Sequence, residues 1–315
     1  MAIGSRIRGG LYGVAVGDAL GATVEFMAQE IVQKRYGVLT DIIGGGWLGL
    51  APGDWTEDTE LTLAVASGIV QAPHDPVNAV GEEFLRWYKT NPSTAGTTIA
   101  AVFQQVIGGC SWHEAAYQLH CKTAYTAGNE ALMRTLPVGL AYCERKELMD
   151  KTQAVAQMTH WDNRAVITCQ LYSMLAYFLL GGKNVADSIS AAHLWLAEHY
   201  PDREALQSLW LELKEKMAKP ESTGYTVDTL ACVLWALKSG ADLEQAVIAA
   251  VNLGGNANTV GALTGGLAGV CYGFEAIPSR WLAKISPGQR ERLDKAAASI
   301  KRLRGRMFME DSYYS

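Results

Sequence analysis

Three features of the sequence predict an all-α fold for this 315-residue chain. Apolar residues recur at three- and four-residue steps in most periodic segments, which is the spacing of one face of a helix. Alternating, strand-like runs are few, and no linker rich in Pro, Gly or Ser divides the chain. Two segments also carry a glycine at every fourth position. We therefore expect one compact helical domain that spans residues 1–315 and contains little or no sheet.

The glycine repeats predict two central helices, one near each end of the chain. Glycine in a helix interior costs about 1 kcal/mol relative to alanine, so a stripe of glycines is favourable where a second backbone packs very close. Membrane helices use the same spacing, but the charged residues Arg6, Arg8 and Asp18 argue against a membrane helix. We expect both helices to be buried. The repeats are Gly9, Gly13, Gly17 and Gly21, and Gly261, Gly265 and Gly269.

The C-terminal third shows how the predicted helices begin and end. Residues 227–237 have apolar positions at three- and four-residue steps, and Gly240 follows where a helix would end. Asp242 and Gln245 have the spacing of a capping box. A further helix should therefore begin directly after Asp242.

Composition and charge exclude several classes of function. The formal net charge is −5 and no sustained basic face is present, so nucleic-acid binding is not expected. The six cysteines are scattered without a CxxC pair, which is typical of reduced cysteines in a cytoplasmic protein. The N-terminus lacks a signal-like apolar core, and no apolar stretch is long enough to span a bilayer. We therefore expect a cytoplasmic protein with no membrane contact.

Three segments place carboxylates, hydroxyls and small residues before or within predicted helices. Residues 17–26 contain Glu25, residues 52–59 contain the run 56–59, and residues 254–259 open the second glycine-rich helix. Oxygens grouped in this way can converge on a hard cation such as Mg²⁺, which prefers octahedral oxygen coordination. The sequence leaves other roles open, because Thr56 or Asp58 could cap backbone amides and Asn258 could be a plain helix cap. Glu25 could also be an ordinary surface carboxylate.

Five landmarks in the same order along the chain resemble those of the ADP-ribosylglycohydrolases. The first two are GDALGA followed by Glu25, in residues 17–25, and GDWTEDT in residues 53–59. The third is GNEALMRTLP in residues 128–137, and the fourth is Thr159-His160 followed by Asp162. The fifth runs from residue 225 to residue 281 and includes AVNLGG and IPSRW. The resemblance therefore covers nearly the whole chain.

The resemblance implies an orthogonal all-α bundle with two magnesium ions in a cleft. It implies that Glu25 lies near the metals, as a ligand or as a mobile group, and that Glu25, Glu57 and Asp58 carry catalysis. ADP-ribose would lie across the same cleft. The implied metal ligands are Thr56, Glu57, Asp58, Asn256, Asn258 and Thr259.

The resemblance also implies which residues contact the substrate. In this family the loop at residues 44–47 and the segment at residues 128–133 flank the ribose and the diphosphate. Backbone amides at helix starts suit a diphosphate well. His160 is either a core histidine or a substrate contact. The implied substrate-binding residues are Gly44, Gly45, Gly46, Trp47, Gly128, Asn129, Glu130, Leu132, Met133 and His160.

The chain departs from the family pattern at three metal-site positions. The family usually has TDDT where this chain has TEDT, and GGDxDT where this chain has GGNANT, with Asn256 and Asn258. Two magnesium ions carry four positive charges, whereas Glu25, Glu57 and Asp58 supply three negative charges. We therefore expect one magnesium site to be weak or empty. Aspartates at 256 and 258 should raise metal affinity and leave stability in metal-free buffer nearly unchanged.

The resemblance predicts a magnesium-dependent hydrolase that removes ADP-ribose from a protein side chain, arginine above others, or from a small molecule. Its partners would be ADP-ribose or ADP-ribosylated proteins and small molecules. Two alternatives remain. A catalytically impaired ADP-ribose-binding protein would follow from the amides at Asn256 and Asn258. A structural protein is the other, because this fold has been reused in jellyfish lens crystallins.

Overall fold

The computed structural model describes residues 1–92 and 94–314, and over these residues it confirms the predicted all-α architecture. The described chain has no strand, only the isolated bridges Gly45–Leu50 and Gly128–Tyr225. Its elements are α1 (Ile3–Gly21), α2 (Gln29–Tyr36), α3 (Glu57–Gln71), α4 (Pro76–Tyr88), α5 (Thr97–Ile107), α6 (Trp112–Thr123), η1 (Leu132–Arg134), α7 (Leu136–Ala141), α8 (Arg145–Ala156), α9 (Asn163–Leu180), α10 (Val185–His199), α11 (Arg203–Ala218), α12 (Thr226–Ser239), α13 (Leu243–Val251), α14 (Ala257–Tyr272), η2 (Phe274–Ala276), α15 (Ser279–Leu282) and α16 (Pro287–Tyr314).

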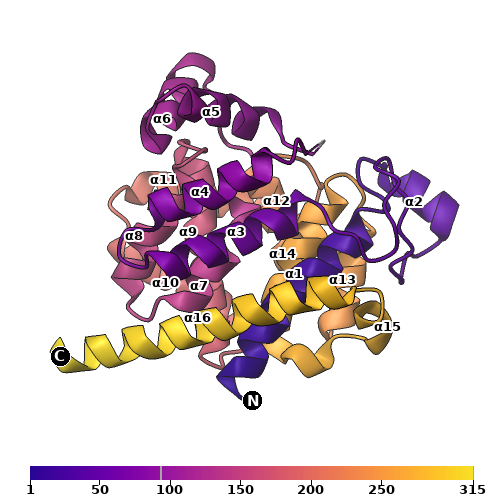
Figure 1. Ribbon diagram of the computed structural model, residues 1–315. Helices are drawn as coiled ribbons and strands as arrows, with labels where there is room; N and C mark the ends of the chain where they lie inside the picture. The colour runs from indigo at the N-terminus through magenta and orange to yellow at the C-terminus, as the bar shows by residue number, and fades with distance from the viewer. Residues whose placement is uncertain (93, 315) are drawn as a thin grey trace.

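Helices α1 and α14 lie side by side in the middle of the molecule, as the glycine repeats predict (Figure 1). A Cβ atom added to Gly13 would lie 2.0 Å from the carbonyl oxygen of Gly265, and one added to Gly17 would lie 2.1 Å from that of Gly261. Real Cβ atoms do not approach backbone this closely. Any larger residue in this glycine seam would therefore push the two helices apart.

The order of the contacts along the glycine seam shows that α1 and α14 are antiparallel. Gly9 lies against Gly269 near one end, and Gly21 lies against Ala257 at the other. The C-terminal end of α1 is therefore beside the N-terminal end of α14. This arrangement brings the first and third oxygen-rich segments together, although more than two hundred residues separate them in the sequence.

The other helices surround this central pair. Helix α3 packs against α4, α7 and α16, and the long α16 crosses the face of the molecule toward the C-terminus (Figure 1). Helices α5 and α6 lie together on one side, and α2 projects on another (Figure 1). Since α3 begins next to the acidic end of α1, its first turn contributes directly to the candidate site.

The predicted helix bounds in the C-terminal third are confirmed. Residues 227–237 lie in α12, and the side chain of Asp242 caps α13 by accepting a hydrogen bond from the amide of Gln245. In a capping box the Gln245 side chain would accept from the amide of Asp242. Here it accepts from the amide of Ala241, one residue earlier. None of the six cysteines forms a disulfide with another described residue. Among the described helices, none is both long and apolar enough to cross a membrane.

Candidate active site

Asp18, which the sequence analysis did not assign to the site, caps helix α3 from a different helix. Its carboxylate accepts hydrogen bonds from the amides of Thr56 and Thr59 at 3.0 and 3.1 Å. It also accepts from the hydroxyls of Thr56 and Thr59 at 2.8 and 2.6 Å. The open question about Thr56 is thereby answered, because its hydroxyl binds Asp18 and does not cap α3.

The N-terminal ends of α3 and α14 meet at Asp58. The Asn258 side chain donates from Nδ2 to Oδ2 of Asp58 at 3.1 Å and to Oγ1 of Thr56 at 3.3 Å. The hydroxyl of Thr259 donates to the same Asp58 oxygen at 3.3 Å. Asn258 is therefore not a plain helix cap, because its side chain binds the second segment. Residues of the second and third segments lie within one coordination sphere of each other.

Glu25 and Glu57 lie at the edge of this cluster. Glu25 follows α1 and is 6% exposed, so it is not the surface carboxylate that the sequence left open. Its Oε2 accepts a 2.7 Å hydrogen bond from Nε1 of Trp47, and its side chain also contacts Asn258. Glu57 is the first residue of α3 and hydrogen-bonds to the Thr94 side chain. Both carboxylates thus border the residues that join α3 to α14.

Burial of four carboxyl groups in one place raises all four of their pKa values. Burial, opposed by hydrogen bonds from Thr59 and Thr56, raises the pKa of Asp18 to about 7. Burial and the nearby Asp18 raise the pKa of Glu25 to about 7. Burial and the charges of Glu25 and Glu130 raise the pKa of Glu57 to about 7. Burial and three neighbouring carboxylates raise the pKa of Asp58 well above its ordinary value. Such a cluster is unfavourable unless positive charge is supplied.

Three buried oxygens in the cluster have no hydrogen-bond partner: Oε2 of Glu57, Oδ1 of Asp58 and Oδ1 of Asn258. Unpartnered buried oxygens are costly, and a bound cation is one way to satisfy them. In the described chain no three His, Cys, Asp or Glu side chains already form a ligand group. The available oxygens belong to a mixed set of carboxylate, hydroxyl and amide groups, which suits a hard cation such as Mg²⁺.

Asn256 points to a different neighbour from Asn258. Its Oδ1 accepts a hydrogen bond from Nδ2 of Asn129 at 3.3 Å, and Asn129 also donates to the hydroxyl of Thr229. The amide of Asn129 donates to the carbonyl of Gly224. Asn256 therefore links the third segment to the segment that begins at Gly128, so two sequence-predicted sets of residues are adjacent.

His160 is fully buried and belongs to a chain of polar contacts that ends at Glu130. Arg134 donates to Oγ1 of Thr159 at 2.7 Å, and that hydroxyl lies 2.8 Å from Nδ1 of His160. The Nε2 atom of His160 lies 3.3 Å from Oε2 of Glu130 and has no hydrogen-bond partner. His160 is therefore a buried histidine next to Glu130, and its contact with the substrate stays a prediction.

The other predicted substrate residues divide into two groups. Gly44, Gly45 and Gly46 have positive φ angles and form a tight loop that presents Trp47 next to Glu25. Leu132 and Met133, in contrast, are 0% and 2% exposed and lie in the hydrophobic core. For these two side chains the expectation of substrate contact is wrong in this structure. The short helix η1 that they form packs against α3 and α9 and is needed for the core.

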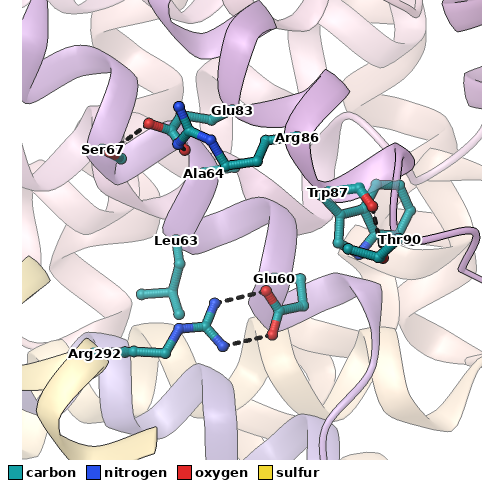
Figure 2. A pocket seen from close by; sticks show the side chains of 9 residues that line it. All are labelled: Glu60, Leu63, Ala64, Ser67, Glu83, Arg86, Trp87, Thr90 and Arg292. Carbon is teal, nitrogen blue, oxygen red and sulfur yellow. Dashed lines mark hydrogen bonds and ion pairs between the residues drawn. The ribbon is translucent and has the colours of Figure 1, made fainter. Parts of the chain in front are cut away.

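A groove lies elsewhere, between α3, α4 and α16 (Figure 2). It has a volume of about 520 Å³, and its charged groups are already paired. Arg292 makes two hydrogen bonds to Glu60, at 2.8 and 2.6 Å, and Glu83 accepts from Arg86 and Ser67. A smaller groove of about 460 Å³ borders the candidate site at Gly128 and is also lined by Tyr125, Arg164, Gly224 and Tyr225.

Known proteins resemble the chain over nearly its full length. The sequence model of the ADP-ribosylglycohydrolase family matches residues 1–310. The ADP-ribosyl-[dinitrogen reductase] glycohydrolase of Rhodospirillum rubrum is 34% identical, over 89% of this chain and 90% of the relative. The ADP-ribosylarginine hydrolase Tri1 of Serratia proteamaculans is 29% identical, over 94% and 78%. A solved structure, named as an ADP-ribosylglycohydrolase-related protein complex, superposes with a TM-score of 0.81 at 31% identity and covers 96% of this chain and 99% of its own.

These similarities agree with the order of the five sequence landmarks and with the site at the ends of α1, α3 and α14. The matched region includes every residue of the carboxylate cluster. The chain therefore belongs to the ADP-ribosylglycohydrolase family, hydrolases that act on glycosidic linkages of ADP-ribose.

Proposed function

We propose that the protein, acting as a single domain in the cytoplasm, is a magnesium-dependent hydrolase that releases ADP-ribose from arginine side chains. The observation that carries this proposal is the set of unpartnered buried oxygens on Glu57, Asp58 and Asn258, placed among carboxyl groups of raised pKa. The names of the relatives from Rhodospirillum rubrum and Serratia proteamaculans support ADP-ribosylated protein and ADP-ribosylarginine as the substrate class.

The cation would be held by the oxygens of Thr56, Glu57, Asp58, Asn258 and Thr259. Bound there, Mg²⁺ would orient the ribose hydroxyls and polarise the water that attacks. Asp18 would act through Thr56 and Thr59, because its carboxylate fixes the hydroxyls of both. Asp18 also changes the expected charge balance, because it adds a fourth carboxylate to Glu25, Glu57 and Asp58. Four negative charges match two magnesium ions. The remaining reason to expect a weak second magnesium site is that Asn256 and Asn258 are neutral amides.

Glu25 is the best placed general base. Its Oε2 is taken by Trp47, which leaves Oε1 for a water molecule at the edge of the cluster. The water oxygen forms a bond to the anomeric carbon of the ribose as the bond from that carbon to the arginine nitrogen breaks. Glu25 accepts the water proton and then passes it to the leaving guanidine nitrogen, which returns Glu25 to its ionised form. Glu57 and Asp58, negatively charged nearby, stabilise the positive charge that develops on the ribose ring.

The nucleotide part of the substrate fits the groove beside Gly128. This groove joins the cluster through Asn129 and Asn256, and Tyr125 and Tyr225 offer aromatic faces next to Arg164. The Arg164 guanidinium is held by two hydrogen bonds to Asp162, at 2.9 and 2.7 Å. An adenosine diphosphate could therefore lie along this groove with its ribose at the carboxylates.

A catalytically impaired ADP-ribose-binding protein remains the second candidate, and one observation favours it. The amide nitrogen of Asn258 already donates to Asp58 and Thr56, so it partly takes the place of a cation. The structure offers no comparable observation for a crystallin-like role.

The test is an ADP-ribose release assay on arginine- and serine-linked substrates, with added Mg²⁺ and with a chelator. We expect release from the arginine linkage that stops when the chelator is added. Release that is unaffected by the chelator would contradict the magnesium role. Tight ADP-ribose binding without release, restored to release by Asn256→Asp together with Asn258→Asp, would establish the second candidate.

A further inference from the structure

The loop that leads into α3 carries Thr56 and packs against the C-terminal part of the chain. Gly53 has a φ angle of +102°, and a Cβ atom added to it would lie 2.0 Å from the carbonyl oxygen of Lys284. The Gly53 carbonyl also accepts a hydrogen bond from Nε2 of Gln289 at 3.0 Å. Since residues 52–56 lie outside the helix, these contacts help to fix where its first turn begins.

Arg292 joins α16 to that first turn. Its guanidinium donates two hydrogen bonds to the Glu60 carboxylate, at 2.8 and 2.6 Å, and such paired bonds combine strength with a fixed geometry (Figure 2). The indole of Trp55 donates to Oε1 of the same carboxylate at 2.8 Å, and its ring centre lies 5.6 Å from the guanidinium carbon of Arg292. One carboxylate therefore ties α16 both to α3 and to the loop before it.

This clamp, formed by Arg292, Glu60 and Trp55, lies on both sides of the candidate metal ligands in the sequence. Trp55 immediately precedes Thr56, and Glu60 follows Asp58 by two residues. The amide of Glu60 donates to the Thr56 carbonyl at 3.3 Å, so the clamp also holds the first hydrogen bond of the helix. The Glu60 carboxylate lines the groove between α3, α4 and α16. The clamp therefore holds the backbone that carries the ligands from outside the carboxylate cluster.

A second ion pair attaches α16 to the rest of the molecule. Arg8 of α1 makes two hydrogen bonds to Asp294, at 2.7 and 3.2 Å, and its guanidinium carbon lies 3.7 Å from the ring centre of Phe274. Both pairs are partly exposed, and pairs of this kind contribute little to overall stability. Because α16 stays attached without Arg292, the distinct contribution of Arg292 is local and concerns the start of α3.

We propose that Arg292 is a positioning residue for the candidate metal site, which acts by fixing the first turn of α3 through Glu60 and Trp55. This inference rests on the magnesium site of the proposed function. Asp58 must lie against Thr259 for oxygens of α3 and α14 to reach one ion. Mg²⁺ demands nearly ideal octahedral geometry. A small displacement of the α3 start should therefore weaken its binding.

Charge and position make opposite predictions for the removal of Arg292. The guanidinium is positive, so its loss would strengthen the binding of a nearby cation if charge alone mattered. Loss of positioning would weaken that binding instead. The sign of the change in Mg²⁺ affinity therefore separates the two effects.

The test is a calorimetric titration with Mg²⁺ of the whole protein, first freed of metal with a chelator, with and without Arg292→Met. Methionine keeps the apolar stem and removes the guanidinium. We expect the Kd to rise about tenfold, as for other residues that orient metal ligands. Arg8→Met is the matched control, because it makes the same change in the other ion pair of α16, and its Kd should stay within about twofold. If Arg292→Met does not fold, Arg292→Lys, which keeps the charge and loses the paired hydrogen bonds, is compared in the same way.

Two results would overturn the proposal. An unchanged or lower Kd in the Arg292 variant would mean that the residue acts by charge alone or not at all. Equal weakening by Arg8→Met would mean that loosening α16 anywhere has the same effect, so the clamp would have no specific role.

Failure of the proposed function would look different, because the unaltered protein would then bind no Mg²⁺. In that case hydrogen exchange of the metal-free protein decides the role of Arg292. The amides of Thr56 and Thr59 donate to Asp18 and report the position of the α3 start. Faster exchange of both amides in Arg292→Met, but not in Arg8→Met, would support the proposal. Exchange at the unaltered rate would overturn it.

Discussion

The glycine seam that runs along the α1–α14 pair and the acidic cluster at one end of that pair differ in almost every physical property. Along the glycine seam the backbones touch, and no charged side chain intervenes. At the acidic end, Asp18, Glu25 and Asp58 are buried together, their pKa values are raised, and oxygens of Asp58 and Asn258 have no partner. The seam is closely packed backbone, whereas the acidic end violates the usual pattern of burial, because it buries carboxyl groups together and leaves oxygens without partners. Violations of this kind are expected at functional sites.

Packing along the seam explains how the unfavourable acidic end is tolerated. The seam fixes the separation and register of the two helices, so the carboxylates of Asp18 and Glu25 and the unpartnered oxygen of Asn258 are held near one another. Packing along the seam therefore keeps the carboxylate cluster in a geometry that can bind a cation. Changes in the seam should alter folding, and changes at the acidic end should alter mainly metal binding and activity.

The largest effect is expected in the seam itself. Gly13→Val places side-chain atoms where the Gly265 carbonyl lies 2.0 Å from the Cβ position, and both neighbours are backbone. The unfolding free energy should fall by about 3 kcal/mol or more, as measured by urea denaturation. Gly4→Ala on the same helix is the control, because only the flexible Lys301 side chain lies near it. If both variants were equally stable, the seam would not be the element that holds the site together.

The next largest effect is expected at Asp18, where the seam meets the acidic end. Asp18→Ala leaves the amides and hydroxyls of Thr56 and Thr59 without their acceptor. We expect a loss of about 2–3 kcal/mol in metal-free buffer. Activity should fall at least a hundredfold, because Thr56 and Asp58 lose their orientation. Asp54→Ala, which removes an exposed carboxylate near the same helix, should change both quantities little.

A smaller effect is expected at Asn258, where aspartate should lower the stability of the metal-free protein and raise its affinity for Mg²⁺. The structure corrects the expectation that aspartate here leaves metal-free stability unchanged, because Asn258 donates hydrogen bonds to Asp58 and Thr56. Asn258→Asp replaces that donor with a carboxylate facing Asp58. Stability should fall by about 1–2 kcal/mol without metal, while affinity for Mg²⁺ rises about tenfold. Asn256→Asp, which faces Asn129, should show the smaller loss. Identical behaviour of the two variants would contradict the orientation of Asn258.

The smallest expected effect is a pH dependence of stability. The pKa values of Asp18, Glu25 and Glu57 are raised to about 7, so the folded protein binds protons there that the unfolded chain releases near pH 4. This contribution to stability is full below about pH 4 and is lost as the pH rises through 7. The metal-free Tm should therefore fall between pH 5 and pH 8.

Magnesium should reverse this trend, because it replaces the bound protons. The rise in Tm on adding Mg²⁺ should be about 2 °C or more larger at pH 8 than at pH 5.5, by scanning calorimetry. Glu25→Gln combined with Glu57→Gln should flatten the metal-free slope. A metal-free Tm that rises with pH would show that these carboxyls are ionised without difficulty in the folded protein.

The sequence predicted the fold and most of the cluster for physical reasons that can be read locally. A glycine at every fourth position has few explanations other than close helix packing, and Thr56, Glu57 and Asp58 share one helix start. It did not identify Asp18, because that residue acts on a helix start about forty positions away. It also placed Leu132 and Met133 in the site, since a motif does not show which of its residues face the core. The direction of the Asn258 amide depends on Asp58 and could be seen only in three dimensions.

A calorimetric titration of the unaltered protein with Mg²⁺ at pH 7.5, repeated in buffers of different ionisation enthalpy, tests whether the carboxylate cluster binds a cation. If the carboxylate cluster is a cation site, we predict saturable binding accompanied by proton release, because carboxyls with pKa values near 7 must give up protons to bind the metal. Asp58→Asn should weaken this binding at least tenfold. No binding at millimolar Mg²⁺, or binding that Asp58→Asn leaves unchanged, would contradict the assignment of the cluster as the metal site.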